Sequence, residues 1–187
     1  MKFRHVGLLC LSAIVALSSC VSAPRVSDPS GVDINVALVP ENYLLQMYGS
    51  GPNDGNPYRT PGSMITGKPH EFVRLGITIA STRKATIYVD GIVAKNAAGE
   101  EVARFYPKSE FSDYTAQWSN KMRARAQEII QDTYVPDSGF VVSPGKVTYY
   151  AVLIGKKELP RPLTVTASVG VDTDSPRQLV VEVAEKK

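Results

Sequence analysis

Residues 73–89 read VRLGITIASTRKATIYV and contain two short stretches in which apolar side chains alternate with others. Val73 to Ile79 and Ala85 to Val89 each repeat with a period of two, which is typical of a β-strand with one buried face. The polar residues Ser81 to Lys84 between them indicate a turn. This stretch therefore predicts two neighbouring strands and a mainly β fold.

The same alternation recurs along the chain. It predicts further strands at residues 32–38, 163–169 and 179–183. Residues 92–106 predict a hairpin with Asn96 to Gly99 as its turn. Val147 to Ile154 is apolar or aromatic at nearly every position, so we expect a central strand covered on both faces. Strands that do not alternate with helices favour an antiparallel β-sandwich, and their number and spacing favour an immunoglobulin-like one.

One stretch departs from this period. Residues 112–132 contain no proline or glycine, and their larger apolar residues recur at helical spacing. These residues are Phe111, Tyr114, Trp118, Met122, Ala126 and Ile129. We predict one amphipathic helix over about 112–132, begun by Ser112 or Asp113 and ended by Pro136. Tyr114 and Trp118 suit an aromatic platform for stacking, but their shared stripe favours core packing.

Composition limits the classes of function. The chain has 187 residues, 43% hydrophobic and 21% charged, which suits one core. Its formal net charge of +3 falls to +1 without Lys2 and Arg4, so there is no basic surplus that would favour nucleic acid. The cysteines, Cys10 and Cys20, both precede residue 21, so we expect no disulfide, metal cluster or cofactor in the folded part.

The amino terminus carries the most specific signal. Lys2 and Arg4 precede an apolar run at residues 6–17, which is too short to span a bilayer and is typical of an export leader. Leu17-Ser18-Ser19-Cys20 follows and resembles the lipobox of bacterial lipoproteins. The resemblance implies cleavage between Ser19 and Cys20, a thioether-linked diacylglycerol on Cys20 and often a further acyl chain on its amino group. The alternative is an ordinary leader cleaved elsewhere, such as after Ala23.

This resemblance sets the expected organisation. Residues 1–19 are the signal peptide, 20–31 an acylated flexible tether rich in Ser and Pro, and 32–187 a single β-sandwich domain. The expected location is the cell envelope, with the membrane contacted through the acyl chains on Cys20. In Gram-negative lipoproteins an aspartate after the lipidated cysteine tends to retain the protein at the inner membrane. Val21 stands there instead, which favours the outer membrane in such a host.

The long loop at residues 49–69 is the candidate contact surface. It contains five glycines and four prolines, and compact domains rarely keep so long an irregular segment. Tyr58, Arg59 and Met64 are its candidate partner-binding residues, because loops often carry recognition and Tyr and Arg are frequent interface anchors. The alternative interpretation is a connector between strands.

Other motifs are weaker. Asp172 with Asp174, and Asn53 with Asp54, offer oxygen ligands of the kind calcium accepts, although both pairs are more typical of turns. Ser81 and Lys84 match the Ser-x-x-Lys spacing of penicillin-recognising enzymes, but a turn between strands is favoured there. His70 has no second metal ligand in view and is interpreted as a loop histidine.

Together these observations predict a lipid-anchored envelope lipoprotein that acts as a non-enzymatic binding or assembly module with an envelope protein partner. Two alternatives stay open. One is an envelope hydrolase acting on cell-wall material, which would need two acidic side chains facing each other across a pocket. The other is a carrier that holds an apolar ligand in a cavity inside the sandwich.

Overall fold

The computed structural model describes residues 25–29, 31–61, 70–137, 139–155, 158–172 and 177–183. Its strands are β1 (Arg25–Asp28), β2 (Val32–Leu38), β3 (Glu71–Ser81), β4 (Ala85–Lys95), β5 (Glu101–Phe105), β6 (Phe140–Val142), β7 (Gly145–Gly155), β8 (Leu163–Val171) and β9 (Arg177–Val183). Its helices are α1 (Glu41–Tyr48), α3 (Lys108–Thr115) and α4 (Asn120–Thr133). Within these ranges, no helix is both long enough and apolar enough to cross a membrane.

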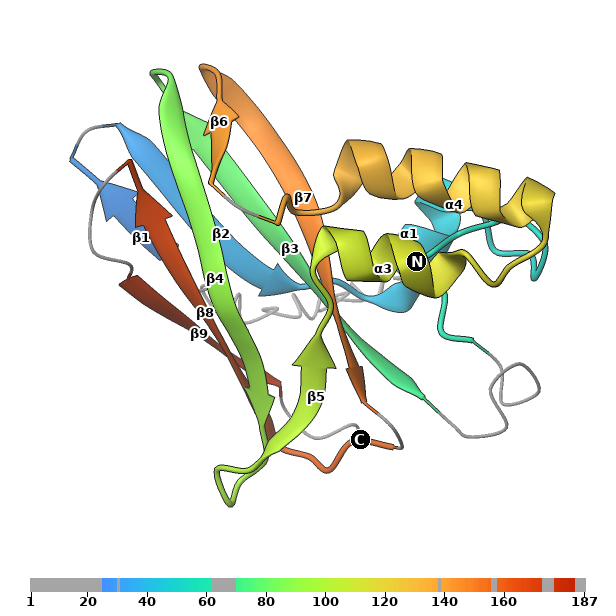
Figure 1. The fold of residues 1–187 in the computed structure, drawn as a ribbon. Helices are drawn as coiled ribbons and strands as arrows, with labels where there is room; N and C mark the ends of the chain where they lie inside the picture. Colours follow the sequence, from blue (N-terminus) through green and yellow to red (C-terminus); the bar gives the residue numbers. More distant parts are fainter. Residues whose placement is uncertain are drawn as a thin grey trace, which may run out of the picture.

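The strands form a nearly closed antiparallel sheet (Figure 1). Their order is β1-β2-β3-β7-β5-β4-β8-β9, and β6 pairs with β4. At the two ends of this order, β9 returns close to β1 and β2. The short pairing of β5 with β7 connects the two halves of the sheet. The predicted mainly antiparallel β class is confirmed.

The inner side of the sheet holds the core that the alternation predicts. In β2, Val32, Ile34 and Val36 are buried, whereas the residues between them are partly exposed. The register pairs Ile34 with Ile79, so apolar side chains of neighbouring strands lie on the same side. Strand β8 repeats the pattern from Leu163 to Val169. Burial of each such side chain stabilises the fold by about 1.5–3 kcal/mol.

The predicted hairpin is confirmed, and its first strand, β4, is longer than expected. β4 and β5 are antiparallel, and the Asn96 carboxamide oxygen accepts hydrogen bonds from the backbone N–H groups of Ala98 and Glu100 at 3.0 Å each. β4 continues from Ala85 to Lys95, with a change of register against β8 between Asp90 and Val93. Gly91, at a φ of 57°, lies in this irregularity, where a side chain would strain the backbone.

A second apolar layer lies on the outer side of β3 and β7. Helices α3 and α4 lie side by side next to these strands (Figure 1). Phe72 of β3 contacts Phe111 of α3 at 6.5 Å between ring centroids, and Tyr134 after α4 stacks on Phe111 at 4.8 Å. This layer explains why β7 is buried on both faces from Tyr150 to Gly155, which confirms the predicted central strand over that part.

The prediction of one continuous helix at 112–132 is wrong. The chain forms α3 and α4 with a break at residues 116–119, where Ser119 has an extended ψ of 150°. A continuous helix of that length would extend about 31 Å in one direction. The break instead folds α4 back along α3, so that both Phe111 and Ile130 reach the buried layer. Tyr114 packs against Phe72 and Phe111, which confirms its interpretation as core.

Three elements were not expected from the sequence. Arg25–Asp28, inside the range assigned to the tether, pairs with β2 as β1. Phe140–Val142 pairs with β4 as β6. Helix α1 follows β2, and its Leu44 side chain is fully buried. Each is short and takes its stability from the sheet that it contacts, so its own sequence pattern is weak.

Candidate functional site

The described part of the 49–69 loop is tied to the buried layer. Tyr58 has 0% exposure, and its hydroxyl lies 2.8 Å from that of Thr133 in α4. Burial raises the pKa of Tyr58 well above its usual value, so the side chain stays neutral. Tyr58 therefore stabilises the fold and is not on the surface. Arg59 is half-buried, and Met64 lies outside the described residues.

Two buried polar side chains hold this segment in place. The Asn56 amide donates to the carbonyl oxygens of Leu44 at 3.0 Å and Gly49 at 2.9 Å, which ties the loop to the end of α1. Arg74, 6% exposed, donates from Nε to the carbonyl of Tyr58 at 2.6 Å and lies 2.9 Å from the Glu41 carboxylate. These contacts fix the described part of the loop, residues 49–61, against α1 and β3.

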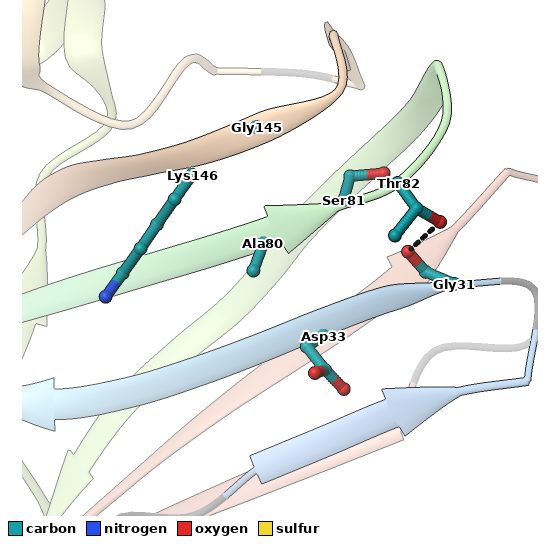
Figure 2. A pocket seen from close by; sticks show the side chains of 7 residues that line it. All are labelled: Gly31, Asp33, Ala80, Ser81, Thr82, Gly145 and Lys146. Carbon is teal, nitrogen blue, oxygen red and sulfur yellow. Dashed lines mark hydrogen bonds between the residues drawn. The ribbon is translucent and has the colours of Figure 1, made fainter.

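A surface depression of about 640 Å³ lies on the outer side of the sheet, at the opposite end of β2 from α1. Its lining residues come from the starts of β2 and β7 and from the end of β3. They are Gly31, Asp33, Ala80, Ser81, Thr82, Gly145 and Lys146. Asp33 pairs with Ala80, and Ala80 pairs with Lys146, so these three form one row across three strands. Figure 2 shows the row on the same side of the sheet.

At one wall of the depression, the backbones of Gly31 and Thr82 approach each other closely. The Thr82 backbone N–H donates to the Gly31 carbonyl at 3.0 Å, and the Thr82 hydroxyl donates to the same oxygen at 3.2 Å (Figure 2). Gly31 has a φ of 90°, and a Cβ there would lie 2.3 Å from the Thr82 hydroxyl oxygen. Glycine is therefore the residue that fits this position.

The depression carries charged side chains of both signs, one on each side of the small residue Ala80. Asp33 forms an ion pair with Arg25 of β1, while the Lys146 side chain is exposed at the other end of the row. Hydrogen bonds from Ser27 and then Arg25 hold the pKa of Asp33 below its usual range, so its carboxylate is ionised at neutral pH. Ala80, whose side chain is a single methyl group, lies between the two charged residues in this row.

The chemistry of this depression suits recognition. The Ser81 hydroxyl donates to the Arg83 carbonyl at 2.6 Å, so it is engaged in the turn. Across the described ranges, no group of three or more His, Cys, Asp or Glu side chains is placed to hold a metal ion. The exposed Lys146 ammonium can donate to a polar partner, and the Thr82 and Asp33 oxygens keep acceptor capacity beside their contacts with Gly31 and Arg25.

The other candidate motifs take structural roles. Ser81 ends β3 and Lys84 precedes β4, which confirms the turn interpretation. Asp172, at a φ of 56°, accepts a long-range hydrogen bond from the backbone N–H of Thr86 in β4 at 2.9 Å. The Asp54 carboxylate accepts one from the Gly51 backbone N–H at 2.6 Å within its own turn. His70 lies directly before β3, and Asp174 lies outside the described residues.

Sequence reasoning missed the depression because its residues are far apart in the chain. Asp33 and Lys146 are separated by more than one hundred positions, and only the strand order β2-β3-β7 brings them into one row. The available signal was weak: Gly31 and Gly145 each stand before a predicted strand, which indicates a turn or a close backbone approach.

A scan against protein-family models finds no match, and no curated protein matches the sequence. Among solved structures, the chain is similar to the X-ray structure of Northeast Structural Genomics Consortium target SoR45. The two are 11% identical with a TM-score of 0.32, over 82% of this chain and 85% of that chain.

Proposed function

We propose that the protein is a lipid-anchored lipoprotein of the cell envelope that acts as a non-enzymatic binding or assembly module. The observation that carries this proposal is the Leu17-Ser18-Ser19-Cys20 motif directly after the apolar leader. The outer membrane is the proposed location in a host that has one, because Val21 replaces the retaining aspartate. An immunoglobulin-like arrangement of the strands is part of the proposal and rests on strand number and spacing alone.

The structure supports a binding role through the depression beside β1. A hydrolase of the kind considered above would use two facing carboxylates. The Asp33 carboxylate instead contacts the guanidinium of Arg25, with Lys146 in the same row. A carrier would need an internal cavity, whereas Ile34, Ile77 and Leu153, among the inward side chains that the structure describes, have no exposed surface. We therefore propose that the depression contacts an envelope protein.

The anchor is tested by replacing the lipidated residue. We expect the wild-type chain to float with membranes in a density gradient and to carry the mass of its acyl chains on Cys20. We expect the Cys20→Ser variant to lose both properties, because the thioether bond needs the cysteine sulfur. A Ser18→Ala variant, which keeps a small residue in the motif, serves as the matched control. Wild-type protein with residue 20 absent or without added lipid mass would contradict the proposal.

The partner surface is tested by photo-crosslinking in cells. A photoreactive residue replaces Ala80 at the centre of the depression, or Ala98 in the exposed β4–β5 turn as the control. We expect the probe at position 80 to capture an envelope protein that the probe at position 98 does not capture, because crosslinking requires close contact. Mass spectrometry identifies the captured protein. Capture of the same protein with equal yield from both positions would argue against the depression.

A further inference from the structure

The hydroxyl groups of the depression are turned towards its own backbone. The Ser81 hydroxyl donates to the Arg83 carbonyl at 2.6 Å, and the Thr82 hydroxyl donates to the Gly31 carbonyl at 3.2 Å. A hydroxyl carries one hydrogen, so neither group keeps a donor for a partner. Among the side chains that line the depression, the Lys146 ammonium is therefore the donor that a partner can use.

The two charged residues of the row differ in whether a neighbour offsets their charge. The Asp33 carboxylate forms an ion pair with the Arg25 guanidinium. Within the described part of the chain, every ion pair joins residues other than Lys146. Two strand spacings put the backbones of Asp33 and Lys146 about 10 Å apart, close to the Debye length at 0.1 M salt. Asp33 is therefore too far away, and too well paired, to balance the charge of Lys146.

The floor of the depression lets a group from outside approach Lys146. Ala80, its neighbour on β3, contributes only a methyl group, and Figure 2 shows it between the longer side chains of Asp33 and Lys146. At Gly145, an added Cβ would have no heavy atom within 4 Å, so the backbone next to Lys146 borders open space. The β7 end of the depression thus combines an unpaired ammonium with room for its counter-charge.

We infer that the envelope partner places the carboxylate of an aspartate or glutamate on the Lys146 ammonium, an inference that rests on the proposed function. A carboxylate supplies both an acceptor for the ammonium and the negative charge that this end of the depression lacks. A lysine or arginine of the partner would be repelled there, and an apolar side chain would leave Lys146 unpaired. Because Lys146 is exposed, this contact acts more on the choice of partner than on affinity.

The test measures photo-crosslinking in cells from a probe that leaves the depression intact. A photoreactive residue replaces Thr148, which is exposed and lies two residues beyond Lys146 on the same side of β7. We expect Lys146→Gln to lower the yield of the captured envelope protein about two- to fivefold, the effect typical of an exposed ion pair. Lys146→Arg should keep the yield. Lys95→Gln, at the exposed end of β4, is the matched control, and urea unfolding shows that each variant is folded.

Charge exchange then identifies the acidic residue. Mass spectrometry of the crosslinked peptide locates the aspartate or glutamate of the partner nearest the probe. We expect Lys146→Glu to lower the yield further, and a lysine in place of that acid to restore it. An unchanged yield in Lys146→Gln, or an equal loss in Lys146→Arg, would overturn the acidic contact while the capture itself leaves the proposed function standing. No capture from position 80 or position 148 would overturn both.

Discussion

At the scale of single residues, Tyr134 shows how one hydroxyl joins the helical layer to the sheet. It donates to the Tyr106 carbonyl at 2.5 Å and accepts from the Val152 backbone N–H at 3.0 Å. Burial raises the pKa of Tyr134 far above its usual value, which keeps the hydroxyl protonated as a donor. A phenylalanine would fill the same space and make neither bond.

We therefore expect Tyr134→Phe to lower the free energy of unfolding by about 1–3 kcal/mol, because a buried backbone N–H loses its partner. Tyr88→Phe is the matched control, since Tyr88 is 39% exposed, and its effect should stay within about 0.5 kcal/mol. Urea unfolding followed by circular dichroism measures both variants. Equal losses in the two variants would show that the Tyr134 hydroxyl has no special role.

Residue type also explains why the sequence suggested a surface contact for Tyr58, a side chain that the structure buries. Glycine and proline around it indicate an irregular segment, and irregular segments are usually exposed. Its hydrogen-bond partners, Arg74 and Thr133, are distant in sequence. A pattern within the loop carries no information about them.

At the scale of elements, α3 and α4 complete each other's ends. Asp137, beyond α4, accepts hydrogen bonds from the backbone N–H groups of Lys108 and Ser109 at the start of α3. In return, the Lys108 ammonium donates to the Gln131 carbonyl near the end of α4 at 2.9 Å. Both contacts also place a charge favourably against a helix dipole. The cap that the sequence suggests at Ser112 or Asp113 is not used, since α3 begins at Lys108.

This arrangement predicts which helix-capping side chain contributes more to the free energy of unfolding. Asp137→Ala should lower the free energy of unfolding by about 1 kcal/mol, because it removes the acceptor for the first N–H groups of α3. Ser119→Ala should change it by no more than a few tenths of a kcal/mol, because the Ser119 side chain makes no capping hydrogen bond to α4. Thermal and urea unfolding give the comparison. A larger loss from Ser119→Ala would reverse the assignment.

At the scale of the whole molecule, β1 connects the proposed anchor to the depression, because Arg25 pairs with Asn35 and forms an ion pair with Asp33. Tethering raises the local concentration of such a module, so modest affinity can give high occupancy.

The sequence by itself determined the features that depend on neighbouring residues. Alternation predicted β2, β3, β8 and the β4–β5 hairpin, because a strand at a core surface needs apolar side chains at every second position. The Leu17–Cys20 motif is equally local, and its expected lipidation depends on no fold. Tertiary structure decided the rest. The break between α3 and α4, the burial of Tyr58 and the row from Asp33 to Lys146 all depend on contacts between distant segments, whose energies a local pattern does not contain.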